Sequence, residues 1–113
     1  MEPIRIALVG IGKIARDQHI PAIDGSPAFS LAATVSPNHK GPEGIAHHSS
    51  LDELLEKGPA IDAVALCTPP QVRYDLAVQA LKRGVHVFLE KPPGATLSEV
   101  VALRDRADKV GVT

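Results

Sequence analysis

The sequence has very few aromatic residues and a single cysteine. Two Phe, one Tyr and no Trp occur among its 113 residues, although 44% of the chain is hydrophobic. A core must therefore be built from Ala, Val, Ile and Leu, which is typical of sheets covered by helices on both faces. Cys67 has no second cysteine with which to form an internal disulfide. These shortages favour α/β architecture.

The sequence also lacks an excess of either charge and any long apolar run. Twelve basic and thirteen acidic residues leave a formal net charge of −1. Nucleic acid and anionic membrane surfaces are therefore poor candidates as partners. No secretory h-region or bilayer-spanning stretch is present. We expect a cytoplasmic protein whose ligand is a small molecule.

Short apolar runs alternate with helical patterns along the chain. A helix should begin near Gly12, with a kink or break where Pro21 removes a backbone donor. The stretch from Ser36 to Gly44 has little helical periodicity. The weak strand after it should lie at a sheet edge or lead directly into the next helix. The expected strands are residues 4–9, 29–35, 45–47, 61–67 and 85–89.

The remaining helices have clear start and stop signals. Ser50 with Glu53, and Thr96 with Glu99, have the spacing of capping boxes, in which the glutamate reaches back to the cap. The helices should end at Gly58, Gly84 and just before Gly111. The expected inner face of the third helix is Val72, Leu76, Ala80 and Leu81. That of the last helix is Leu97, Val100, Val101, Leu103 and Ala107.

Alternating strands and helices predict a Rossmann-type, doubly wound parallel sheet with right-handed crossovers. Four to five strands are visible, whereas a complete doubly wound domain usually has six. We therefore expect residues 1–113 to form one Rossmann-type domain that stops before its last strands.

A glycine turn follows the first expected strand and has the sequence Gly10-Ile11-Gly12-Lys13-Ile14-Ala15. Gly10 permits a tight turn, Gly12 lets the backbone approach a pyrophosphate, and Ala15 lets helix and strand pack closely. Helix N-terminal amides can hold phosphate charge. Gly10, Ile11, Gly12, Lys13 and Ile14 are therefore candidate cofactor-binding residues, although a small-residue turn without a ligand would look similar.

The acidic residue that commonly binds the adenosine ribose is missing after the second strand. Its place is taken by Ser36-Pro37-Asn38-His39-Lys40, which has donors for a 2′-phosphate and no carboxylate to repel it. We expect NADP as cofactor with NAD tolerated, and Ser36, Asn38 and His39 as contacts. The alternative is an ordinary solvated loop, because no arginine is present to clamp the phosphate.

The segment Cys67-Thr68-Pro69-Pro70 ends the strongest expected strand, near the place where ligands lie in open α/β sheets. Its backbone should line the nicotinamide side of a cofactor site. Cys67 itself is expected to be a packing residue and not a nucleophile, since no partner base can be assigned.

Glu90-Lys91-Pro92-Pro93 ends the last expected strand at the same edge of the sheet. A desolvated lysine can have its pKa lowered from about 10.4 toward 7–8, which suits proton transfer. Lys91 is therefore the catalytic candidate, and a surface ion pair between Glu90 and Lys91 is the alternative. The five histidines have no metal-ligand spacing, so we expect no metal site.

Together these motifs resemble the N-terminal half of the glucose-fructose oxidoreductase and inositol dehydrogenase family. The resemblance rests on the glycine turn with His19 and Pro21-Ala22, and on Thr68-Pro69-Pro70, Gly84-Val85-His86-Val87 and Glu90-Lys91-Pro92. More narrowly, the chain is similar to bacterial aldose 1-dehydrogenases that act on D-galactose or L-arabinose. Arg73 departs from the histidine that many family members have near this position.

The resemblance implies an NAD(P)-dependent oxidoreductase that transfers hydride from C1 of a sugar to the cofactor and gives the lactone. It implies that Lys91 lies beside the nicotinamide and the substrate hydroxyl, that Glu90 contacts the nicotinamide ribose, and that Pro92 follows a cis peptide bond. It also implies a C-terminal substrate domain and a homo-oligomeric intact protein, so these 113 residues should bind cofactor without turning over sugar.

Three other functions stay open on the sequence alone. One is another sugar or inositol dehydrogenase of the same family. A second is a nucleotide-binding or redox-sensing module without catalysis. A third is an S-adenosylmethionine-dependent transferase, which also has a glycine turn after its first strand but leaves Glu90-Lys91-Pro92 unexplained.

Overall fold

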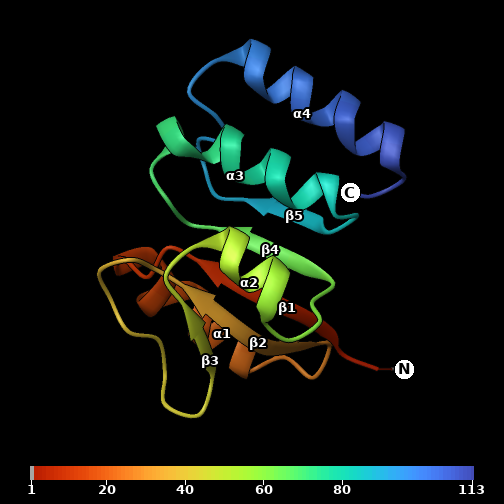
Figure 1. Ribbon diagram of the computed structural model, residues 1–113. Coiled ribbons are helices and arrows are strands. Elements are labelled where there is room, and N and C mark those ends of the chain that lie inside the picture. The colour runs from red at the N-terminus through yellow and green to blue at the C-terminus, as the bar shows by residue number, and fades with distance from the viewer. Residues whose placement is uncertain (1) are drawn as a thin grey trace.

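The computed structural model describes residues 2–113 and contains one five-stranded sheet (Figure 1). Every neighbouring pair of strands is parallel. The order β3-β2-β1-β4-β5 places the first strand at the centre, with the chain winding outward on both sides. This is the expected Rossmann-type, doubly wound order. The strands are β1 (Ile4–Val9), β2 (Phe29–Val35), β3 (Ala46–His48), β4 (Ala63–Leu66) and β5 (His86–Leu89).

Helices cover the two faces of the sheet unequally. Helices α2, α3 and α4 lie on one face, with α4 packed mainly against α3, and η1 with α1 lies on the other (Figure 1). Among the helices of residues 2–113, none combines the length and the apolar character that a membrane crossing requires. The helices are η1 (Ala15–His19), α1 (Ile20–Asp24), α2 (Leu51–Lys57), α3 (Pro70–Lys82) and α4 (Leu97–Val110).

The core is aliphatic on both faces, as the composition predicts. Successive residues of a strand point to opposite faces, so β1 contributes Ile6 and Leu8 to one cluster and Ala7 and Val9 to the other. The cluster under η1 and α1 is the smaller one and includes Ile11. The larger cluster includes Val64, Leu66, Leu51, Leu54, Ala77, Ala80, Leu81 and Leu103.

The expected break near Pro21 takes the form of a π-helical turn. Ile20 donates its N–H to the carbonyl of Ala15, five residues back, so this turn is wider than an α-helical one. The widened turn lies directly ahead of Pro21, which has no N–H to continue the helical ladder. The helix therefore continues through the proline instead of ending there.

Both helix caps form, but their glutamates bind elsewhere. The hydroxyls of Ser50 and Thr96 each accept the N–H of the residue three positions on, at 3.2 Å. The Glu53 carboxylate is 2.9 Å from His48 Nδ1, and the Glu99 carboxylate accepts the N–H of Ala95, and not that of Thr96, at 3.0 Å. The prediction that Glu53 closes a capping box on Ser50 is therefore wrong, because an imidazole just before the cap is a competing partner.

The buried faces of α3 and α4 differ from those expected. Val72 is 47% exposed, Leu97 is 79% exposed and Val101 is 37% exposed, although the helical pattern predicts all three on inner faces. Helix α3 is turned so that Arg73 is buried, and α4 packs mainly on α3 and leaves its first turn in solvent. The fully buried residues are Arg73, Ala77, Ala80 and Leu81 on α3 and Leu103 on α4.

Strand boundaries shift only slightly from the expected ones. Strand β4 is Ala63–Leu66, shorter than residues 61–67, and β5 begins at His86. Strand β3 is displaced by one residue and lies at the sheet edge, directly ahead of α2. Within the described chain, residues 36–45 contain no helix, as their composition predicts.

An ion pair joins β1 to the segment that leads into β4. Asp62 accepts the Arg5 backbone N–H at 2.8 Å, and its carboxylate oxygens lie 3.1 Å from Arg5 Nε and 2.9 Å from a terminal guanidinium nitrogen. These hydrogen bonds favour the ionised carboxylate, so the pKa of Asp62 falls from 3.8 to about 2.

The lowered pKa of Asp62 predicts a specific dependence of stability on pH. Its contribution is complete above the ordinary carboxyl pKa of 3.8 and is lost as pH falls through about 2. In Asp62→Asn the unfolding free energy should therefore fall less steeply between pH 5 and pH 2, as measured by urea denaturation. The matched control is Asp75→Asn, an exposed acid on α3. Equal slopes for wild type and Asp62→Asn would contradict the assignment.

Candidate cofactor and catalytic site

Four segments with candidate site residues lie together at the carboxyl ends of the strands, which form one edge of the sheet. Because the strands are parallel, their carboxyl ends point the same way, and ligands bind outside that edge in open α/β sheets. The glycine turn follows β1 and the loop 36–45 follows β2. Residues 67–70 follow β4 and residues 90–93 follow β5. The arrangement brings every predicted site residue to the same side of the molecule.

The two glycines of the turn lie in different surroundings: Gly10 is tightly packed, whereas the backbone at Gly12 is open. Gly10 has φ of 92° and donates its N–H to the Val35 carbonyl at 2.8 Å. A Cβ at Gly10 would lie 3.1 Å from backbone atoms of Cys67 and Thr68, so the turn after β1 touches the turn after β4. A Cβ at Gly12 would meet nothing within 4 Å. The open backbone at Gly12 is what the close approach of a pyrophosphate requires.

The other residues of the glycine turn divide between core and solvent. The Ile11 and Ala15 side chains are buried beneath the helix, which matches the close packing expected of Ala15. Lys13 and Ile14 are exposed, and Lys13 Nζ lies 2.5 Å from Asp17. A buried Ile11 side chain leaves its backbone as the part available to a ligand. The cofactor contacts of all these residues stay predictions.

The loop after β2 is shaped by a serine whose oxygen is already engaged. Ser36 is 6% exposed, and its hydroxyl oxygen accepts the N–H groups of Asn38 at 3.3 Å and His39 at 3.1 Å. Its carbonyl accepts a hydrogen bond from His47 Nε2 at 3.1 Å. Asn38 and His39 are exposed. Ser36 therefore builds the loop, while Asn38 and His39 present side chains at its surface.

An arginine reaches this loop from another element. Arg16 lies in η1 and donates from a terminal nitrogen to the Lys40 carbonyl at 3.4 Å. The expectation that no arginine is available near the loop is therefore wrong. The loop itself contains no arginine, but the fold brings the helix that follows the glycine turn beside it.

A cavity of about 310 Å³ lies between the glycine turn and the start of α2. Gly10, Pro37, Ser50, Thr68 and Gln79 are among its lining residues. Its volume is at the lower end of the range of about 300–1,000 Å³ that ligand pockets occupy. A hollow of about 560 Å³ around Arg5 and Asp62 lies at the opposite edge of the sheet, away from the glycine turn.

Residues 67–70 form a rigid connection between β4 and α3. Cys67 donates its N–H to the Val9 carbonyl at 2.8 Å, and burial raises the pKa of its thiol to about 11. The thiol is therefore protonated near neutral pH, which agrees with a packing role and not a nucleophilic one. Pro69 precedes α3 and Pro70 is its first residue, where a missing N–H costs no hydrogen bond.

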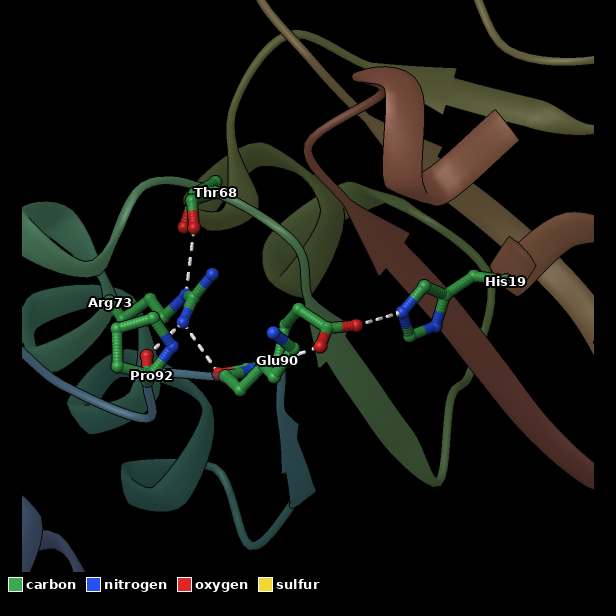
Figure 2. Close-up of polar contacts among 6 residues, drawn as sticks. His19, Thr68, Arg73, Glu90 and Pro92 are labelled. Carbon is green, nitrogen blue, oxygen red and sulfur yellow. Dashed lines mark hydrogen bonds and ion pairs between the residues drawn. The ribbon is translucent and has the colours of Figure 1, made fainter. Parts of the chain in front are cut away.

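The Glu90 side chain is bound by His19, which belongs to η1 on the sheet face opposite α3 (Figure 2). Its carboxylate lies 2.6 Å from His19 Nε2 and also accepts the Lys91 backbone N–H at 3.0 Å. The hydrogen bond with His19 is the largest cause that lowers the pKa of Glu90. Glu90 is thus paired with His19 and not with the Lys91 ammonium, which removes the surface ion pair as an explanation of these residues. Contact of Glu90 with a ribose stays a prediction.

Lys91 is exposed at this edge, and the peptide bond between Lys91 and Pro92 is cis, as the resemblance implies. Burial by the described residues therefore does not supply the desolvation expected of a catalytic lysine. A bound cofactor and substrate would have to provide it.

Arg73 is the main site residue that the sequence interpretation missed. Its buried guanidinium donates to the carbonyls of Thr68, Glu90 and Pro92, so it joins two of the predicted site segments (Figure 2). The available signal was helical spacing. Arg73 is in line with Ala77 and with the buried pair Ala80 and Leu81, at intervals that share one helix face.

The structure groups no metal ligands at this site. Across residues 2–113, no three His, Cys, Asp or Glu side chains come together in a way that could hold a metal ion.

Comparison with known proteins agrees with this geometry. Residues 4–113 match the family described as "Oxidoreductase family, NAD-binding Rossmann fold". This chain belongs to that family. It is the glucose-fructose oxidoreductase and inositol dehydrogenase family that the motifs resemble, and its domain of this kind binds a nicotinamide dinucleotide.

Individual members of this oxidoreductase family are similar over most of the chain. The galactose 1-dehydrogenase of Pseudomonas fluorescens is 54% identical over 99 residues, which cover 88% of this chain and 32% of that protein. The crystal structure of a D-galactose-1-dehydrogenase from Rhizobium etli has a TM-score of 0.96 and 52% identity, covering 100% of this chain and 36% of that one.

The WlbA dehydrogenase from Bordetella pertussis, solved with NADH and UDP-GlcNAcA, has a TM-score of 0.87 and 30% identity. The match covers 99% of this chain and 35% of that one. The chain therefore spans about a third of the length of the relatives that it matches.

The two glycines predict opposite mutational effects. Gly10→Ala should lower the unfolding free energy by about 1–3 kcal/mol, because alanine is strained at this φ and its methyl group would crowd the turn after β4. Gly12→Ala should leave stability nearly unchanged and weaken NAD(P)H binding at least about tenfold, or ~1.4 kcal/mol. Urea denaturation and calorimetric titration measure the two quantities.

Each glycine variant serves as the other's control. Unchanged NAD(P)H affinity in Gly12→Ala would contradict the assignment of Gly12 to the cofactor site. Unchanged stability in Gly10→Ala would contradict the assignment of Gly10 to the close contact between the two turns.

Proposed function

We propose that this chain is the cofactor-binding domain of an NAD(P)-dependent aldose 1-dehydrogenase that oxidises D-galactose, with L-arabinose as the second candidate substrate. One observation carries the proposal: the glycine turn and Lys91 lie at the carboxyl ends of the strands of one sheet, in a chain that is 54% identical over 99 residues to a galactose 1-dehydrogenase. The pocket for the sugar would be built largely by a second domain.

The residues of this chain would perform three tasks in that reaction. The backbone at Gly12 and the loop after β2 would hold the dinucleotide, which supplies a hydride acceptor when it is bound. The turn at Thr68 would border the nicotinamide end. Lys91 would accept the proton from the C1 hydroxyl oxygen of the sugar as the C1 carbonyl of the lactone forms.

Lys91 suits this task because it lies at the ligand edge and because its ammonium group does not pair with Glu90. It is exposed at the ligand edge, and the neighbouring carboxylate of Glu90 is engaged by His19. Its ammonium group is therefore not neutralised by Glu90. A bound sugar and dinucleotide would exclude water from around Lys91, and desolvation disfavours the charged form of an amine.

A panel of aldoses tests the proposed activity in the full-length protein. We expect reduction of NAD(P)+ with D-galactose or L-arabinose, followed at the absorbance of the reduced nicotinamide. Lys91→Ala should lower kcat by about 10²–10⁴-fold, the range for loss of a general base, and change the Kd of the cofactor little.

The control for Lys91→Ala is Lys82→Ala, which removes an exposed lysine near the end of α3. Absence of turnover with every aldose by a folded protein that binds NAD(P)H would reject the dehydrogenase and leave a nucleotide-binding sensor. Full activity of Lys91→Ala would reject the role of Lys91 and leave the substrate assignment standing.

The loop after β2 favours acceptance of NADP as well as NAD. It has no carboxylate from residue 36 to 40, and the Arg16 guanidinium lies beside it. A guanidinium at this loop can bind a 2′-phosphate through charge-assisted hydrogen bonds. A missing carboxylate removes the repulsion that this phosphate would otherwise meet.

Replacement of Arg16 tests this account of cofactor choice. Arg16→Gln should raise the Kd of NADPH about tenfold, equivalent to ~1.4 kcal/mol, while the Kd of NADH changes little. Calorimetric titration with each dinucleotide measures both, and Arg106→Gln, on an exposed position of α4, is the control. An equal change for NADH and NADPH would show that Arg16 does not recognise the 2′-phosphate.

A further inference from the structure

The guanidinium of Arg73 is a buried cation bound by backbone carbonyls. Arg73 is 3% exposed and lies in the first turn of α3. Its Nε donates to the Thr68 carbonyl at 2.7 Å, and one terminal nitrogen donates to the Glu90 carbonyl at 2.5 Å and to the Pro92 carbonyl. Burial of a cation is costly unless its N–H groups are satisfied. These three carbonyls provide that compensation.

The two carbonyls that share one nitrogen of Arg73 flank Lys91. One belongs to the residue before it and the other to the residue after it, so the backbone of Lys91 is held on both sides (Figure 2). The side chain of Lys91 is exposed and is not fixed by burial. The position of the ammonium group therefore depends on where the backbone is anchored.

Other contacts fix the strand side of the same segment. The Glu90 N–H donates to the Leu66 carbonyl at 3.3 Å, and the Glu90 carboxylate is bound by His19. These contacts hold residue 90 relative to β4 and η1. The contact with Pro92 is the one that ties the far side of Lys91 back to α3.

The third contact of Arg73, with the Thr68 carbonyl, connects the Lys91 segment to the turn after β4, which lies beside the glycine turn. Thr68 lies next to Gly10, where a Cβ would be 3.1 Å from the Thr68 backbone nitrogen. One planar group thus contacts both the turn that borders the glycines and the segment that carries Lys91. The rigid fork of an arginine can donate in several fixed directions at once, which the ammonium of a lysine cannot reproduce.

We infer that Arg73 is a positioning residue that sets the place of Lys91 relative to the bound dinucleotide. This inference rests on the proposed function, in which Lys91 accepts the proton from the sugar. Arg73 itself touches neither substrate nor cofactor in this role. It acts through the Glu90 and Pro92 carbonyls.

The decisive variant is Arg73→Lys in the full-length protein, because it keeps the positive charge and removes the fork. A misplacement of about 1 Å can cost about 10²-fold in rate, so kcat should fall about 10- to 100-fold. The Kd of NAD(P)H, measured by calorimetry, should change less than about threefold, since the glycine turn is intact.

Two further measurements separate positioning from a general loss of folded protein. With D-galactose deuterated at C1, the isotope effect on kcat should be at least as large in Arg73→Lys as in the wild type, because slowed chemistry contributes more to the limiting rate. A smaller folded fraction would lower the rate and leave the isotope effect unchanged. Hydrogen–deuterium exchange should increase in a peptide covering residues 88–95 and stay at the wild-type level in α4.

The matched control is Arg83→Met. Arg83 follows the last residue of the same helix and also donates to a carbonyl at 3.3 Å. That carbonyl belongs to Leu55, outside the segment that carries Lys91, and the Arg83 side chain is partly exposed. It should leave kcat and the isotope effect unchanged. If Arg73→Lys does not fold, Arg73→Gln replaces it, because its amide donates hydrogen bonds without leaving a charge buried.

The outcomes distinguish this inference from the proposed function. A wild-type kcat in a folded Arg73 variant would overturn the positioning role, and so would a lower kcat with unchanged exchange of residues 88–95. Lack of aldose turnover by the wild-type protein would instead reject the proposed function. In that case unchanged exchange of residues 88–95 would also overturn the anchoring by Arg73, whereas increased exchange would support it.

Discussion

Parallel alignment of the strands is the constraint on which the site depends. Strands that run in one direction place all their carboxyl ends at one edge, so segments distant in sequence become neighbours there. Alignment brings the segments together but does not fix their spacing. The close contact of Gly10 with Thr68 and the three hydrogen bonds of Arg73 supply that second level of order. A backbone contact and one buried side chain therefore fix the spacing of the segments that carry the candidate site residues.

The sheet and the turn chemistry could be predicted from the sequence because their causes are local. A β-branched run that stops at Gly10 and a serine three residues ahead of Glu53 each act within a few residues. The family motifs were equally accessible, since they are short and keep their order along the chain. What placed the candidate residues at one edge was the alternation of strand and helix, which is also a property of the sequence.

The missed features depend on contacts between distant elements. Arg73 looked like a departure from a family pattern, because nothing near it in the sequence shows that carbonyls 17 and 19 residues away accept its hydrogen bonds. The capping-box pattern predicts that the Glu53 carboxylate binds the backbone of Ser50, but it binds the His48 imidazole instead. Arg16 reaches a loop 24 residues away. In each case a long polar side chain can reach several hydrogen-bond partners near it in the sequence, but the tertiary fold places a different partner within its reach.

The engagement of Ser36 has an evolutionary consequence. The residue that shapes the loop after β2 is buried and bonded, while Asn38 and His39 stand outside the packed structure. Exposed positions outside a core tolerate substitution with little effect on stability. Selection can therefore exchange the side chains that we propose to contact the dinucleotide while the scaffold that holds them stays unchanged. Dinucleotide preference in such a domain can drift between lineages without any cost to the fold.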